Sequence, residues 1–142
     1  MSTMAAISAQ AAESIFYTCF ENGDLDAMME IWDATPDIVC VHPMGASLMG
    51  VEAVRDSWRQ ILEGDGQMKF TTHIIHRFES DNLSVHHLYE EIAFGQDFSE
   101  RSFVIATNIY RRTPQGWRIV AHHGSPGRLP AAPKNPPSRA MH

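Results

Sequence analysis

The sequence lacks any apolar run of the roughly 18 residues that a membrane-spanning helix needs, so we expect no contact with a membrane. A secretory signal peptide starts with basic residues followed by a long apolar stretch. Residues 1–10 have neither feature. Cysteine is scarce too, because the chain has only Cys19 and Cys40, each within an apolar pattern. Together these features predict a cytoplasmic protein whose two cysteines are reduced core residues.

Basic residues are also few. The chain has 11 Lys and Arg against 17 Asp and Glu, which gives a formal net charge of −6. An acidic surface repels a phosphate backbone, so we expect no nucleic acid partner. Residues 125–142 hold five of the eight prolines and lack the apolar residues for a core. We therefore predict one domain over residues 1–128 and a disordered, proline-rich tail over residues 129–142.

Helices are predicted in the first half of the chain, where apolar residues recur with helical spacing. The first helix ends at about residue 22, before Gly23, and Asp24 caps a second helix that carries Met28 and Trp32. A third helix is predicted over residues 51–63 and ends at a Gly-Asp-Gly turn. The stripe of the first helix consists of Ala12, Ile15, Phe16, Cys19 and Phe20.

Strands fill the second half. The segments 68–78, 83–94, 101–112 and 117–123 alternate in polarity and are joined by short turns, which favours antiparallel pairing. A further short strand is predicted at residues 38–42. Helices first and strands last indicate an α+β fold, in which three N-terminal helices pack on a curved antiparallel sheet to form a cone-shaped roll. The interior of such a cone can hold a hydrophobic ligand pocket.

Several short motifs, in this order, resemble the SnoaL-like branch of the nuclear transport factor 2-like superfamily. The resemblance covers about residues 11–128, and it implies the cone fold and a homodimer formed through the sheet face. Members include isomerases, cyclases and dehydratases, but also non-catalytic binding and assembly domains. The motifs are Asn22-Gly23-Asp24, His42-Pro43-x-Gly45, Thr107-Asn108, Gly116-Trp117-Arg118 and His122-His123-Gly124.

His42 is the candidate catalytic residue. It occupies the position where the ketosteroid isomerases of this superfamily carry the aspartate that shuttles a proton, and histidine titrates close to neutral pH. The tyrosine of those enzymes aligns with Phe16, with Tyr17 one place away, and their second acid falls near Thr107 or Asn108. Because the oxyanion donors are not visibly kept, the resemblance argues against ketosteroid isomerisation itself.

Ligand-binding roles are predicted for five further residues, on the assumption that each lines the cone. His122 and His123 point to opposite faces of the last strand, so at most one of them enters the cavity. A buried carboxylate at position 90 or 91 would also suggest function, but the sequence does not separate the two. The five residues are Trp58, Tyr89, Asn108, His122 and His123.

Two functions remain open from the sequence. The first is binding of an apolar or aromatic small organic molecule with His-assisted proton transfer, and the second is a non-catalytic ligand-binding or dimerisation module. The histidine and cysteine spacings match no metal site, so we expect neither a metal nor another cofactor.

Overall fold

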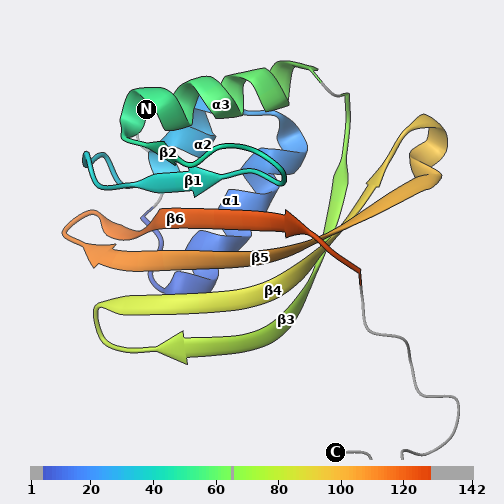
Figure 1. The fold of residues 1–142 in the computed structure, drawn as a ribbon. Helices are drawn as coiled ribbons and strands as arrows, with labels where there is room; N and C mark the ends of the chain where they lie inside the picture. The colour runs from blue at the N-terminus through green and yellow to red at the C-terminus, as the bar shows by residue number, and fades with distance from the viewer. Residues whose placement is uncertain (1–4, 65, 129–142) are drawn as a thin grey trace, which may run out of the picture.

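The computed structural model describes residues 5–64 and 66–128, which form three helices packed on one face of a six-stranded sheet (Figure 1). The predicted tail, residues 129–142, lies outside the described residues. In chain order the elements are α1 (Ala9–Asn22), α2 (Leu25–Ile31), β1 (Val39–Val41), β2 (Leu48–Met49), α3 (Val51–Gly64), β3 (Lys69–Glu79), β4 (Leu83–Phe94), the 3-10 turn η1 (Gln96–Phe98), β5 (Glu100–Thr113) and β6 (Gly116–Pro126).

The first helix ends and the second begins where the sequence predicts. The Ser8 side chain accepts a hydrogen bond from the Ala11 N–H at 3.0 Å and caps α1, and Gly23 ends that helix with a left-handed φ of 65°. The Asp24 carboxylate then accepts from the Ala27 N–H at 3.1 Å and starts α2. This tight corner turns α2 back against α1, so both helices share one core with the sheet.

The sheet has the strand order β2-β1-β6-β5-β4-β3. The four long strands pair with their chain neighbours in antiparallel fashion, as predicted. The predicted all-antiparallel sheet needs one correction, because β1 joins β6 in parallel and makes the sheet mixed. The two-residue strand β2, which the sequence did not predict, pairs with β1. Since β1 lies beside β6, His42 at the end of β1 is brought next to the last strand.

Two β-bulges change which residues face the helices. A bulge between Ile74 and His76 moves the second half of β3 by one residue, so the predicted single face from Phe70 to Phe78 is split. Phe70 packs against the core, whereas Phe78 is 61% exposed. A second bulge, opposite Ile109 and Tyr110, adds Val120 to β6 and lets Ile119 and His122 both lie on the helix side.

The helices cover only one face of the sheet, and no described residue covers the other (Figure 1). The core lies between the two layers and is dominated by aromatic side chains, among them the fully buried Phe16, Trp32 and Trp58. Within the described residues, no helix is long and apolar enough to cross a membrane.

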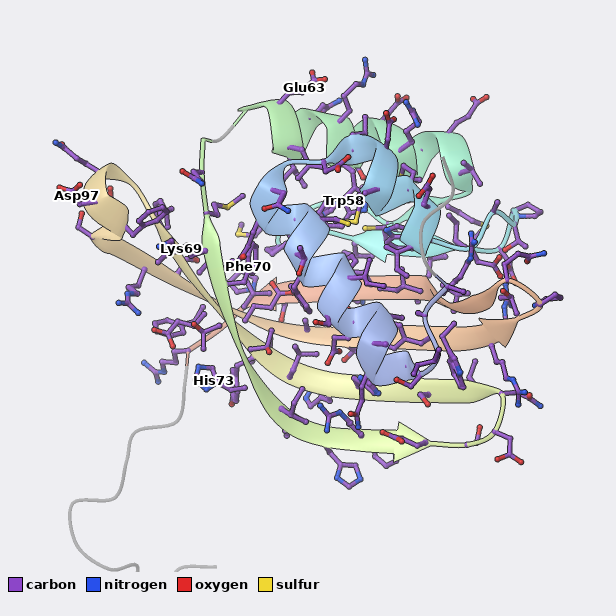
Figure 2. The ribbon with its side chains drawn as sticks, turned by 180° about the vertical axis from the view of Figure 1, so that it is seen from behind. Trp58, Glu63, Lys69, Phe70, His73 and Asp97 are labelled. Carbon is purple, nitrogen blue, oxygen red and sulfur yellow. The ribbon has the colours of Figure 1, made fainter. Side chains whose placement is uncertain are left out.

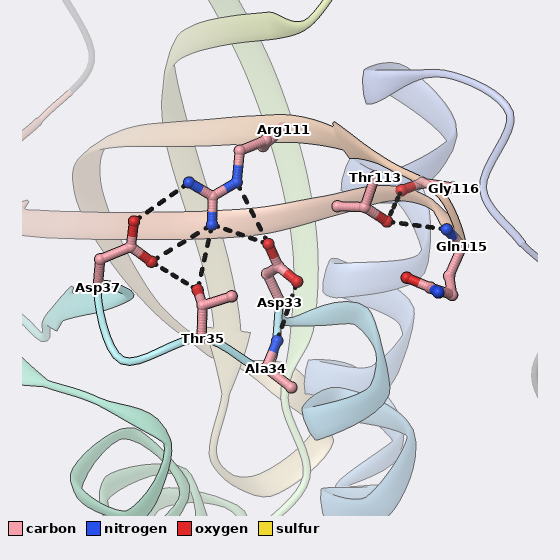
Figure 3. A network of polar contacts seen from close by, with 8 residues as sticks. All are labelled: Asp33, Ala34, Thr35, Asp37, Arg111, Thr113, Gln115 and Gly116. Carbon is pink, nitrogen blue, oxygen red and sulfur yellow. Dashed lines mark hydrogen bonds and ion pairs between the residues drawn. The ribbon is translucent and has the colours of Figure 1, made fainter.

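A polar cluster ties the connection after α2 to the end of β5 (Figure 3). The Arg111 guanidinium donates to Asp33 Oδ2 at 2.8 Å and to Asp37 Oδ2 at 3.2 Å, and it also donates to Thr35. Hydrogen bonds from Arg111 and Thr35 lower the pKa of Asp37 to about 2. The cluster therefore fixes the segment that leads into β1.

We expect Arg111→Gln to lower the Tm by about 2 to 4 °C, because one cation holds two carboxylates that bracket a loop. Thermal unfolding followed by circular dichroism measures the shift. Arg112→Gln is the matched control, since Arg112 is the exposed neighbour on the same strand. An equal loss in both variants would show that the cluster has no specific role.

Candidate functional site

A chain of hydrogen-bonded polar side chains crosses the core beneath α1. The Tyr17 hydroxyl donates to Glu90 Oε2 at 2.6 Å, and the Asn108 amide nitrogen donates to the Tyr17 oxygen at 3.0 Å. The Asn108 amide oxygen lies 2.6 Å from His122 Nδ1 and accepts a hydrogen bond from it. All four residues are buried, and they come from α1, β4, β5 and β6. We call them the Tyr17–Glu90 chain.

A second buried cluster lies beside this chain. The Glu13 carboxylate on α1 accepts a hydrogen bond from the Tyr110 hydroxyl at 2.9 Å and lies 3.0 Å from His86 Nδ1. The other ring nitrogen of His86 has no hydrogen-bond partner among the described residues, and it lies 3.8 Å from Glu79 Oε2. Burying ionisable groups is costly unless they are paired, so two such clusters in one small core favour a functional site over simple packing.

His42 lies at the β1 end of this interior, and its hydrogen bonds define its tautomer. The Ser57 hydroxyl donates to the Val54 carbonyl at 2.7 Å, so it must accept from His42 Nε2, which lies 3.0 Å away. His42 therefore carries its proton on Nε2 when neutral, and Nδ1 keeps a lone pair. Its ring centroid is 6.1 Å from that of His122.

Trp58 on α3 fills the space between these histidines and the aromatic core. Its ring makes edge contacts with His42 at 4.8 Å and with Phe16 at 5.5 Å, and its centroid is 6.0 Å from that of His122. Trp58 is fully buried, and its indole N–H has no partner among the described residues. Trp58 therefore forms an apolar, water-excluding surface next to both histidines.

Burial shifts the pKa values of the acidic members of the chain upward. Removal from water raises the pKa of Glu90 to about 7, although the hydrogen bond from Tyr17 favours the carboxylate and limits the rise. Burial and the neighbouring Glu90 charge raise the pKa of Tyr17 well above its usual value. Near neutral pH, Glu90 is therefore partly protonated and partly ionised, while Tyr17 stays a neutral phenol.

The two histidines are shifted in the opposite direction. Burial lowers the pKa of His42 to about 4, and burial together with the neighbouring His42 and His123 lowers the pKa of His122 to about 3. Both rings are thus neutral at pH 7. A neutral imidazole is the form that accepts a proton as a general base.

A groove of about 400 Å³ between α1 and β3 opens onto these clusters. Tyr17 and Glu13 line it, so each cluster presents one member there. Figure 2 shows the helix-covered side of the sheet, with Phe70 on β3 next to α1. The Phe70 ring lies 5.6 Å from that of Tyr17 and gives the groove an aromatic wall. The remaining lining residues are Gln10, Ser14, Thr18, Glu21, Thr72 and Arg77.

The structure brings four of the six predicted site residues together on the inner face: His42, Trp58, Asn108 and His122. Tyr89 and His123 do not join them. Tyr89 pairs with Ile105 and His123 with Thr107, both on the uncovered face of the sheet. The alternation of β6 places His122 inside and His123 outside, which settles which of the pair lies near the core.

Sequence reasoning missed Glu13 and left the choice between Glu90 and Glu91 open. Glu13 follows the helical stripe of α1 one turn before Phe16 and Tyr17, and this spacing was the available signal. On β4, alternation with the buried Leu88 places His86 and Glu90 inside and leaves Glu91 outside, paired with His73 and Arg101. The described residues contain no group of His, Cys, Asp or Glu arranged to hold a metal, and both cysteines are free.

This geometry defines a cone-shaped α+β protein of the nuclear transport factor 2-like fold, with a polar interior under its first helix. Residues 10–128 match the model of the SnoaL-like domain family, so the chain belongs to that family. No curated protein matches the chain.

Solved structures support the fold. A protein of Thiobacillus denitrificans, provisionally named a calcium/calmodulin-dependent protein kinase type II association domain, is 33% identical, with a TM-score of 0.82 over 87% of this chain and 98% of its own. A protein of Streptomyces avermitilis, provisionally named a dehydratase of the nuclear transport factor 2-like family, is 28% identical, with a TM-score of 0.76 over 84% and 94%. A ketosteroid isomerase-like protein of Erwinia carotovora atroseptica, 15% identical, shares the fold with a TM-score of 0.70 over 84% and 94%.

Proposed function

We propose that this protein binds a small organic molecule in the groove between α1 and β3 and moves a proton to or from it. The observation that carries the proposal is the contact between Tyr17, which lines the groove, and Glu90, a carboxyl group held out of water. A protein that only needed a stable core would gain little from such a pair, because a buried carboxyl group opposes folding when it ionises. The name of the relative from Streptomyces avermitilis points to the same kind of chemistry.

Protonation of Glu90 would change what Tyr17 offers to a ligand. With Glu90 ionised, the Tyr17 O–H donates to the carboxylate. With Glu90 protonated, its O–H donates to the Tyr17 oxygen, and the phenol hydrogen turns toward the groove. Tyr17 then donates to a ligand carbonyl, and a proton passed to the ligand is replaced from Glu90. This arrangement would stabilise a developing oxyanion, which is commonly the largest single contribution to catalysis.

His42 remains the candidate general base that the sequence suggests. Its neutral ring with a lone pair on Nδ1 supports that role. His42 does not line the groove itself; it lies beside His122, which is hydrogen-bonded to Asn108 and through it to Tyr17 in the groove. We expect His42→Ala to abolish turnover while the Tm stays nearly unchanged. Activity equal to that of the wild type would refute a catalytic role for His42.

Hydrogen–deuterium exchange tests proton transfer without knowledge of the net reaction. Wild-type protein in D2O is incubated with a panel of enolisable ketones and keto acids, and loss of the α-proton signal is followed by proton NMR. We expect catalysed exchange of at least one compound and a fall of about 100-fold or more in Glu90→Gln. Glu91→Gln is the control, because Glu91 lies on the other face. Equal rates in both variants would end the acid–base role of Glu90.

Self-association is a second candidate function, supported by the uncovered sheet face. The solvated face of an antiparallel sheet normally carries polar residues. This face instead has a hollow of about 650 Å³ lined by apolar residues: Val39, Val41, Ile105, Ile109 and Ala121. The name of the relative from Thiobacillus denitrificans is that of an association domain. We propose that two copies pair through this face, in the cytoplasm.

A charge placed in the hollow tests this pairing. Ile105→Glu should convert a dimer into a monomer in sedimentation experiments, because a carboxylate would be buried at the contact. Gln60→Glu, on the exposed side of α3, adds the same charge away from the face and should leave the mass unchanged. A wild-type protein that stays monomeric at high concentration would contradict the pairing.

A further inference from the structure

We infer that the ligand of the groove is a carboxylate, held by Arg77. This inference rests on the proposed function, because it names the class of molecule that would meet Tyr17. Arg77 lies on β3 and lines the groove together with Tyr17, Glu13 and Phe70. It stands directly opposite His86 on β4, on the helix side of the sheet.

Arg77 is a cation without a protein partner in the described part of the chain. Its guanidinium makes no ion pair with any described carboxylate, and its Nε is buried without a hydrogen bond. A buried donor without a hydrogen bond lowers the stability of the folded protein, and guanidinium groups commonly pair with a carboxylate. An anion in the groove would remove that cost.

The acids of the groove are already engaged. Glu13 accepts from Tyr110 and lies against His86, while Glu21 accepts the Phe70 N–H at 2.6 Å. Other donors therefore hold both carboxylates, and the Arg77 guanidinium is available to bind an anionic ligand. The Nε2 atom of His86, across from Arg77, also lacks a hydrogen bond among the described residues. Two unpartnered nitrogens thus come from paired positions on neighbouring strands, with Arg77 lining the groove and His86 buried behind it.

The surroundings favour a carboxylate over a phosphate. A single guanidinium matches one planar carboxylate with two parallel hydrogen bonds. A dianionic phosphate would face repulsion from Glu13 and Glu21, which line the same groove. The wall formed by Tyr17 and Phe70 suits an apolar or aromatic body attached to the acid. The inferred ligand class is a small aromatic or apolar organic acid.

Binding of benzoate, measured by NMR titration, tests the inference without any activity assay. Benzamide and inorganic phosphate serve as the neutral and dianionic probes. We expect benzoate to bind the wild type and to bind Arg77→Gln about 10- to 100-fold more weakly, the loss expected for one charged hydrogen-bonded contact. Arg77→Lys should recover part of the affinity, and Arg112→Gln, an exposed arginine at the far end of β5, should match the wild type.

The outcomes separate this inference from the proposed function. Absence of benzoate binding, or equal binding by the wild type and Arg77→Gln, overturns the carboxylate site. Benzamide or phosphate bound as well as benzoate overturns it too. Arg77-dependent benzoate binding without any exchange of α-protons would leave the carboxylate site standing and refute proton transfer. Exchange of α-protons in neutral ketones without benzoate binding would support proton transfer and refute the carboxylate site.

Discussion

Replacing Glu90 with glutamine should stabilise the protein at pH 8 relative to the wild type by about 3 kcal/mol in the free energy of unfolding. The gain comes from removing a carboxyl group whose ionised form is disfavoured by burial. The pKa of Glu90 is about 7 in the folded protein and 4.5 in a solvated reference state. Glutamine keeps an oxygen that accepts the Tyr17 hydrogen bond, so the geometry of the chain is retained.

The sign follows from the raised pKa of Glu90. Below pH 4.5 the carboxyl group is protonated in both the folded and the unfolded protein, and the wild type keeps its full stability. As the pH rises from 4.5 to 7, only the unfolded chain ionises, and stability is lost until the folded-state pKa is reached. The advantage of Glu90→Gln should therefore grow by about 2 kcal/mol between pH 5.5 and pH 8.

Urea unfolding at the two pH values measures this change, and Glu91→Gln serves as the control because its carboxylate is paired with Arg101 on the other face of the sheet. A constant difference between Glu90→Gln and the wild type across this pH range would mean that Glu90 has an ordinary pKa.

The two buried histidines should lower the stability of the wild type in acid, partly offset by protonation of Glu90, and His122→Gln should remove about half of the histidine contribution. The pKa of His122 is about 3 in the folded protein against 6.5 in a solvated reference state, since its ring is fully buried. Stability is complete above pH 6.5 and falls with the pH, because the unfolded chain takes up a proton that the folded chain refuses. Between pH 7 and pH 4.5, His122 should account for about 2.5 kcal/mol of lost stability.

The neighbouring His123 provides the control for this prediction. It is exposed on the other face of the sheet, so His123→Gln should keep the acid sensitivity of the wild type. His42, whose pKa is about 4, should contribute a similar loss that remains in His122→Gln. Unfolding curves between pH 7 and pH 4.5 that run parallel for His122→Gln and the wild type would contradict a neutral, buried His122.

The sequence was sufficient for most of the fold because its local signals agree with one another. Asp24 caps α2, Gly23 ends α1, and alternation marks the four long strands, so helices and strands were predicted close to their observed bounds. The parallel pairing of β1 with β6 has no local signal, since it joins segments about 80 residues apart, Val39 with Ala121. The bulge in β3 was not predicted either, because its extra residue does not interrupt the apolar pattern of the strand.

The candidate site was only half predictable for the same reason. His42, Asn108 and His122 were found as polar residues on strands, but their partners come from other elements. Tyr17 reaches Glu90 across 73 residues, and no spacing rule connects a helix residue to that strand position. Tyr89 was assigned to the cone because sequence alone does not tell which face of β4 meets the helices. The register with β5 supplies that information.

The most direct measurement of the central claim is a carbon-13 NMR titration of the Glu90 carboxyl carbon, assigned by its absence in Glu90→Gln. The account predicts a midpoint near pH 7, with Glu90 exchanging its proton beside Tyr17 at neutral pH. A midpoint near 4.5 would make Glu90 a permanently ionised structural acid and would contradict a proton-transfer site in this core.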